Sequence, residues 1–218
     1  MSNLETQVNR TVHTADALEW LKQSRVGPGH SFVTSMPDFS EFTGVTLTEW
    51  KTWFIAAARL VLHACPDDGI VMFYQTDIKV EGAWVDKGFL CETAAAETNH
   101  NLICHKIVCR APANSVTFGR PGYSHLLGFS KNVKPELKYG LTDVLNEAGE
   151  TTWTRGMGRK ACELACQYIR HHTNSHTIVD PFCGHGSILL VANEFGFHSI
   201  GVEISRKRAR VARNLDRL

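Results

Sequence analysis

The feature that most constrains the fold of this chain is the stretch TIVDPFCGHGSILLVANEFGFHSIGVEIS, residues 177–205. It predicts a strand, a turn on Gly184 and Gly186, a helix, and a second strand that ends in Glu203. A glycine turn between a strand and a helix exposes backbone N–H groups to a ligand. A carboxylate at the end of the next strand is placed to accept ribose hydroxyls. The unit therefore predicts an α/β protein with a nucleoside-binding turn.

Two common nucleotide-binding patterns are excluded. The dinucleotide fingerprint GxGxxG requires a third glycine at position 189, where this chain has leucine. The chain also has no GK[ST] sequence, so it lacks a phosphate-binding P-loop. A turn without any ligand is the remaining structural alternative.

Strands and helices alternate along nearly the whole chain, which is typical of a parallel sheet covered by helices. We find no internal repeat and no long linker, so we expect a single domain over residues 1–218. The first helix is predicted to begin at an N-cap, Thr14. Residues 132–157 are polar and weakly patterned. The predicted strands are 8–14, 30–36, 69–76, 102–110, 123–131, 177–182 and 198–204, and the predicted helices are 15–23, 46–64, 86–98, 159–172, 186–196 and 205–218.

Composition narrows the class of protein without identifying a ligand. The net charge of +1 gives no overall attraction to nucleic acid, so such binding would need a local basic face. The longest apolar runs are interrupted by polar residues, and the N-terminal MSNLETQVNR lacks the apolar segment of a signal peptide. The seven cysteines contain no CxxC pair, which predicts reduced thiols, a cytoplasmic or nuclear location, and no metal site.

The sequence DPFCGHGS resembles motif I of the class I S-adenosylmethionine-dependent methyltransferases. The resemblance is closest to the amino-methyltransferases that modify bases in DNA and RNA. It implies S-adenosyl-L-methionine as cofactor, with Asp180, Phe182, Gly184 and Gly186 around its methionine part and Glu203 on its ribose.

The order of the motifs resembles the permuted, β-class arrangement of these enzymes, in which the catalytic motif precedes motif I. That arrangement implies a Rossmann-like, seven-stranded, mostly parallel sheet with helices on both faces and a terminal antiparallel strand pair. Asp16 matches the carboxylate that binds the adenine amine in this family. The segment GETTWTRGMG resembles the part that closes over the methionine end, which implies contacts from Thr154, Arg155 and Gly156; the usual Lys-Pro at the next helix is Arg159-Lys160 here.

The catalytic motif of the family has the form (Asp/Asn/Ser)-Pro-Pro-aromatic, and residues 35–38 read Ser-Met-Pro-Asp. Taken alone, this stretch would be a strand-ending turn. The resemblance makes it the loop that orients a target amine, with Ser35 and Pro37 retained. Asp38 replaces the aromatic residue, and Phe39, one position later, is a candidate for stacking on the base.

Three functions stay open for this altered loop: methylation of an exocyclic amine, another acceptor with Asp38 as general base, or a methyltransferase-like subunit without activity. A protein or small-molecule acceptor is a further alternative. The closing helix carries six basic residues that either contact phosphates or form a solvated surface. The chain lacks a separate target-recognition domain, so we expect structured RNA rather than DNA, with the help of an activating protein subunit.

Overall fold

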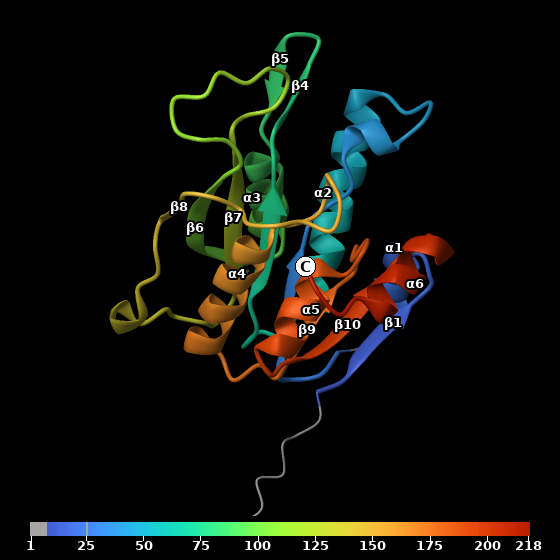
Figure 1. The fold of residues 1–218 in the computed structure, drawn as a ribbon. Helices are drawn as coiled ribbons and strands as arrows, with labels where there is room; N and C mark the ends of the chain where they lie inside the picture. Colours follow the sequence, from blue (N-terminus) through green and yellow to red (C-terminus); the bar gives the residue numbers. More distant parts are fainter. Residues whose placement is uncertain (1–7, 25) are drawn as a thin grey trace, which may run out of the picture.

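The computed structural model describes residues 8–24 and 26–218, and its centre is one large β-sheet (Figure 1). Eight strands pair in the order β1-β10-β9-β2-β3-β7-β6-β8. The first five are parallel neighbours, whereas β7 runs antiparallel to both β3 and β6. The strands are β1 (Arg10–His13), β2 (His30–Thr34), β3 (Val71–Gln75), β6 (Asn101–Cys109), β7 (Tyr123–Ser130), β8 (Val144–Leu145), β9 (Thr177–Asp180) and β10 (His198–Val202).

The fold class that the sequence predicted is confirmed, with two additions. The two-residue strand β8 extends the expected seven strands to eight and lies in the segment that we expected to be unpatterned. A separate hairpin, β4 (Ile78–Val80) and β5 (Ala83–Val85), was not predicted. Both are very short, so neither carries enough alternating residues to be recognised from the sequence.

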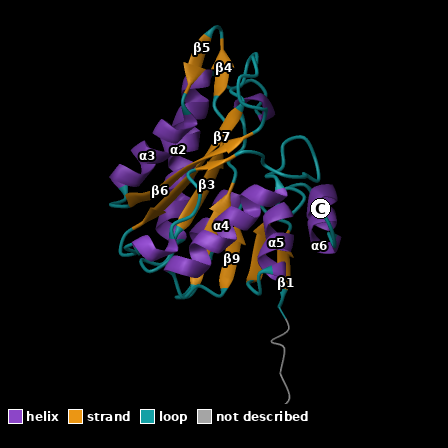
Figure 2. Cartoon of the chain, turned by 60° about the vertical axis from the view of Figure 1, so that its left-hand side comes forward, coloured by secondary structure: helices purple, strands orange, loops and turns teal. Residues whose placement is uncertain are grey.

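The described residues form six helices, which pack against the two faces of the sheet. Figure 2 shows helices both in front of the strands and behind them. One core contains α1 (Ala17–Gln23), α2 (Leu47–Ala64) and α3 (Lys87–Glu97), and the other contains α4 (Arg159–His172), α5 (Ser187–Glu194) and α6 (Arg206–Asn214). Strand β3 serves both cores, because Val71 and Phe73 point to one face while Met72 and Tyr74 point to the other. The buried apolar residues thus form two hydrophobic cores, one on each face of the sheet.

The start of the first helix differs from the sequence prediction. Asp16, and not Thr14, is the N-cap of α1, since its Oδ1 accepts hydrogen bonds from the backbone N–H groups of Leu18 and Glu19. Both threonine and aspartate are good N-caps, so the sequence alone does not choose between them. The prediction of Thr14 as the N-cap was wrong. Asp16, which the sequence singled out as a ligand-binding carboxylate, also caps a helix.

The hairpin β4–β5 projects beyond the main sheet, beside the long loop that joins β6 to β7 (Figures 1 and 2). The backbone N–H of Lys79 donates to the carbonyl of Gly119, which joins the hairpin to that loop. The side chains of Trp84 and Phe118 are exposed there. This projection stands at the end of the sheet where β3 finishes.

All seven cysteines are free thiols in the structure, and six of them are buried. Burial raises the pKa of the Cys166 thiol to about 12, so this side chain behaves as an apolar core residue. Across residues 8–24 and 26–218, no helix combines the length and apolar character needed to cross a bilayer.

Candidate active site

A cavity of about 800 Å³ lies at the carboxyl ends of β10, β9, β2 and β3. This is the point at which the strand order reverses between β9 and β2, where ligands bind in open α/β sheets. Most of the residues that the sequence singled out line this one cavity: Asp16, Ser35, Pro37, Asp38, Thr154, Arg155, Gly156, Asp180, Phe182, Gly184 and Glu203.

Two of the predicted site residues do not line the cavity. Phe39 begins a short 3-10 helix, Phe39–Glu41, and its ring packs edge-on against Trp50 with centroids 5.8 Å apart. Gly186 is the N-cap of α5 with φ of 85°, and a Cβ there would come within 3.0 Å of the Ala212 side chain. Phe39 faces the core beside α2, and Gly186 gives the turn its shape. Neither residue is therefore placed to contact a ligand directly.

The glycine turn is open on its cavity side. Gly184 has φ of 53°, in the left-handed region that favours glycine. The indole of Trp153 lies over the turn, since a Cβ at Gly184 would sit 3.4 Å from Trp153 Cζ2. The same indole packs against His185 with ring centroids 5.1 Å apart. Sequence reasoning missed Trp153, although it lies directly before the predicted Thr154.

Asp180, at the start of the turn, connects the glycine-turn side of the cavity to the strand that leads into Ser35. Its Oδ1 accepts hydrogen bonds from the Thr34 hydroxyl at 2.6 Å and from the backbone N–H of Phe182 at 3.0 Å. Burial raises the pKa of Asp180 to about 7, although both hydrogen bonds oppose that shift. A cation bound beside this group would restore its negative charge.

Glu203 directly follows β10, and Asp16 follows the neighbouring strand β1 as the N-cap of α1. The backbone N–H of Ala15 donates to the Glu203 carbonyl at 3.3 Å, so the two acidic residues stand close together at one edge of the cavity. Glu203 is buried, and its Oε1 accepts from Ser205 N–H and from the Arg208 guanidinium. Oε2 of Glu203 and Oδ2 of Asp16 are the carboxylate atoms that could take ligand donors.

Glu41 connects three walls of the cavity. Its Oε1 accepts from the backbone N–H of Asp38, and its Oε2 lies 3.5 Å from Arg155 and 3.9 Å from Arg208. Arg208 in turn pairs with Glu203 at 3.1 Å. Ion pairs therefore connect three segments: the loop after β2, the segment before α4 and the start of α6. The sequence did not indicate these ion pairs.

Asp38 is held by two cations. Its Oδ2 lies 2.8 Å from Lys87 Nζ and its Oδ1 lies 3.2 Å from Arg120, while Ser40 donates to it from both its backbone and its hydroxyl. Asp38 and Lys87 are only 7% and 3% exposed. Burial raises the pKa of Asp38, but Lys87, Ser40 and Arg120 outweigh that effect and bring it to about 2. A carboxylate with so low a pKa is a weak general base.

The other positions of the loop are divided between the core and the cavity. Met36 replaces a proline and is buried in the core beneath the loop, whereas Ser35 and Pro37 line the cavity. The wall that faces them is formed by the end of β3, with Tyr74, Gln75 and Thr76. Sequence reasoning placed these three residues on a buried strand and did not recognise that its last residues reach the site.

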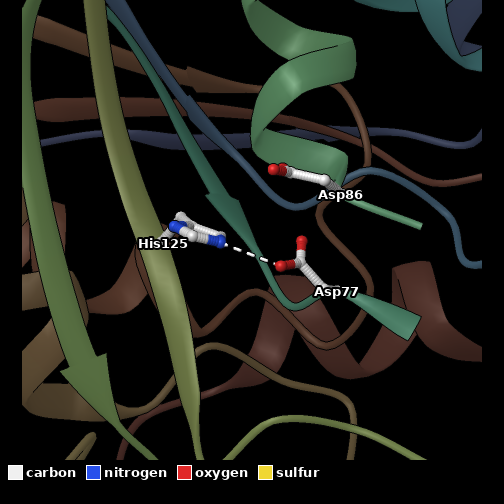
Figure 3. A group of neighbouring side chains, drawn as sticks. All are labelled: Asp77, Asp86 and His125. Atoms are coloured by element: carbon white, nitrogen blue, oxygen red, sulfur yellow. Dashed lines mark hydrogen bonds and ion pairs between the residues drawn. The ribbon is translucent and has the colours of Figure 1, made fainter. Parts of the chain in front are cut away.

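The structure also brings together Asp77, Asp86 and His125, whose possible ligand atoms all lie within 4.8 Å of one another (Figure 3). His125 Nε2 lies 3.1 Å from Asp77 Oδ2, and the Asp77 hydrogen bond raises the pKa of His125. The other oxygen of Asp77 accepts from the Lys87 N–H, and Asp86 caps α3 through the N–H of Phe89. These groups are largely engaged in hydrogen bonds that fix the start of α3 and thereby Lys87.

The six basic residues of the closing helix divide into two groups. Arg208 and Arg213 make internal contacts, to Glu203 and to the carbonyl of Val12 respectively. Arg213 is nevertheless exposed, as are Arg206, Lys207 and Arg210, whereas the exposed Arg217 lies beyond the end of α6 at Asn214 and not in the helix that the sequence predicted there. Part of this helix is therefore structural, and only the exposed part is open to phosphates.

Comparison with solved structures shows which proteins share this fold. The cytosine-N4-specific PvuII DNA methyltransferase superposes with a TM-score of 0.73 at 17% identity over 97% of this chain and 88% of that one. A candidate DNA modification methylase from Thermus thermophilus, solved with S-adenosyl-L-methionine, gives a TM-score of 0.70 at 16% identity over 94% and 93% of the two chains. The M1.HpyAVI complex gives 0.62 at 16% identity over 93% and 97%.

The family profile described as DNA methylase, of the N6 and N4 type, matches residues 46–214. The chain belongs to this family of S-adenosylmethionine-dependent nucleic-acid amino-methyltransferases. The predicted family, fold and cofactor are thus confirmed, whereas the expectation of RNA is not supported, because the family is one of DNA methylases. No curated protein matches the chain.

Proposed function

We propose that this protein transfers a methyl group from S-adenosyl-L-methionine to the exocyclic amine of a base in DNA. The observation that supports it is the continuous cavity that joins the glycine turn at Gly184 to the loop at Ser35. The Thr34–Asp180 hydrogen bond fixes these two parts relative to each other. Membership of a DNA methylase family favours DNA over the RNA that the sequence suggested.

The cavity has room and donors for the cofactor. Gly184 presents its backbone without a side chain, and Glu203 and Asp16 offer carboxylate oxygens for a ribose and an adenine amine. Asp180 provides a buried acid near the place where the cationic methionine part would lie. Trp153 and Arg155 would cover that end. When bound, the cofactor supplies an electrophilic methyl group on sulfur.

The loop residues would position the acceptor. The Ser35 hydroxyl oxygen and a loop carbonyl accept hydrogen bonds from the N–H groups of the amine, which directs the nitrogen lone pair towards the methyl group. A carbon–nitrogen bond forms as the carbon–sulfur bond breaks, and its electron pair goes to sulfur. The nitrogen then loses its proton to water. Asp38 takes no proton in this scheme, since Lys87 and Arg120 keep it ionised and paired.

The test is transfer of a radiolabelled methyl group. The purified protein is incubated with labelled S-adenosyl-L-methionine and, separately, with unmethylated DNA, cellular RNA and a protein extract. We expect label in DNA as N6-methyladenine or N4-methylcytosine. Label only in RNA or only in protein would contradict the choice of acceptor, and cofactor binding without any transfer would support the inactive subunit instead.

A further inference from the structure

Gln75 is the last residue of β3, the strand beside the one that ends at the Ser35 loop. The pairing of Thr34 with Phe73 in these parallel strands places Gln75 level with Met36, across from the residues that would hold the target amine. Gln75 is 1% exposed and lines the cavity. Its side-chain amide therefore belongs to the wall that an acceptor base would meet.

The amide nitrogen of Gln75 has no hydrogen-bond partner. Among residues 8–24 and 26–218, two buried side-chain nitrogen or oxygen atoms lack a partner, Trp50 Nε1 and Gln75 Nε2. Trp50 lies on the buried face of α2 and does not line the cavity, whereas Gln75 lines it. A buried donor without a partner is destabilising, so its presence in a cavity wall points to a ligand that completes it.

Two neighbouring polar groups of this wall, Thr76 and Arg120, already have partners. The hydroxyl of Thr76 bonds that of Ser124 at 2.6 Å, and Arg120 is paired with Asp38. Burial raises the pKa of Tyr74, so its phenol stays neutral. Gln75 Nε2 is thus a buried side-chain donor of this wall that has no partner within the described residues, and it suits a neutral acceptor atom of the substrate.

We infer that Gln75 is a specificity residue whose Nε2–H donates to the ring nitrogen next to the methylated amine. This inference rests on the proposed function. On their Watson–Crick edges, adenine and cytosine present an acceptor ring nitrogen beside the exocyclic amine, whereas guanine presents an N–H there. A donor at Gln75 and an acceptor at Ser35 together match the amine and ring nitrogen of adenine or cytosine. Flipped guanine would bring two donors together.

The experiment uses the methylated site found with labelled DNA, placed in a short duplex. One duplex carries the natural base and the other carries its deaza analogue, 1-deazaadenine or 3-deazacytosine, which lacks the ring acceptor. We expect the wild-type protein to lose roughly ten- to hundredfold in kcat/KM on the analogue, and Gln75→Met to lose about as much on the natural base. Gln75→Met should show no further loss on the analogue.

Two readouts separate this role from a structural one. Gln75→Met removes an unpaired buried amide, so its Tm should equal or exceed that of the wild type while its activity falls. Gln167→Met, at an exposed position of α4, is the matched control and should change neither. Equal analogue sensitivity in wild type and Gln75→Met, or unchanged kcat/KM in the variant, would overturn the assignment with methyl transfer intact. A wild-type protein that methylates no DNA would overturn both proposals.

Discussion

The two halves of the cavity are built in different ways. The cofactor half consists of backbone turns and acids from one short unit, residues 177–205, with Asp16 added from the neighbouring strand. The acceptor half is assembled from distant segments: the Ser35 loop, the end of β3, and Lys87 at the start of α3. The first half depends on shape around glycine, and the second depends on a buried ion pair. Substitutions in the first half should therefore reduce cofactor binding, whereas substitutions in the second half should reduce stability or methyl transfer.

The largest expected effect separates the cofactor half from the rest. Gly184→Asp places a side chain and a negative charge at a residue with φ of 53°, against Trp153. We expect cofactor binding, measured by calorimetry, to be abolished. Gly27→Asp, at an open position outside the cavity, should bind as the wild type does. Retained affinity in Gly184→Asp would contradict the assignment of this turn.

The ion pair of the acceptor half should dominate stability instead. Lys87→Met leaves the Asp38 carboxylate buried without its nearest partner, and we expect a loss of about 3 kcal/mol in the free energy of unfolding by urea. Lys131→Met, which breaks an exposed pair with Asp67, should cost under about 1 kcal/mol. Because the pKa of Asp38 is lowered to about 2, its contribution is complete above about pH 4 and is lost as the pH falls towards 2. Equal losses in both variants would refute this contrast.

Ser35→Ala tests whether methyl transfer and cofactor binding depend on separate parts of the cavity. The change removes the acceptor proposed for the target amine and leaves the glycine turn untouched. We expect kcat to fall by about a hundredfold while the Kd for the cofactor stays within about threefold. Steady-state kinetics and calorimetry measure the two quantities separately. A parallel fall in cofactor affinity would show that Ser35 acts on the cofactor half.

The smallest effect concerns pH. The raised pKa of Asp180, about 7, means that the folded protein binds a proton more tightly than the unfolded chain, so stability falls as the pH rises from about 4 to 7. A cationic ligand favours the ionised acid, and the affinity for the cofactor should increase by about tenfold between pH 6 and pH 8. Asp180→Asn should remove both dependences, with Asp67→Asn as the exposed control. A pH-independent affinity in the wild type would rule out Asp180 as the responsive group.

The same contrast explains how much the sequence could predict. The fold and the residues that gather at the glycine-turn side of the cavity were accessible because motif I and the strand pattern are local and specific. Lys87, Glu41 and Gln75 were not, since each reaches the site through tertiary contacts between segments far apart in the chain. Phe39 was misplaced because nothing in its neighbours shows that Trp50 would take its ring. The shortest strand, β8, and the hairpin carry too few residues for a pattern.

The position of β10 between β1 and β9 has a consequence for how the protein is made. Glu203 N–H donates to the carbonyl of His13, so Glu203 meets the first strand of the sheet only after nearly all of the intervening chain exists. While a ribosome is still producing the earlier elements, the sheet lacks two inner strands and the cofactor has nowhere to bind. S-adenosyl-L-methionine can therefore stabilise the completed sheet but cannot guide the growing one, and ligand rescue of folding variants should act only once β10 has been made.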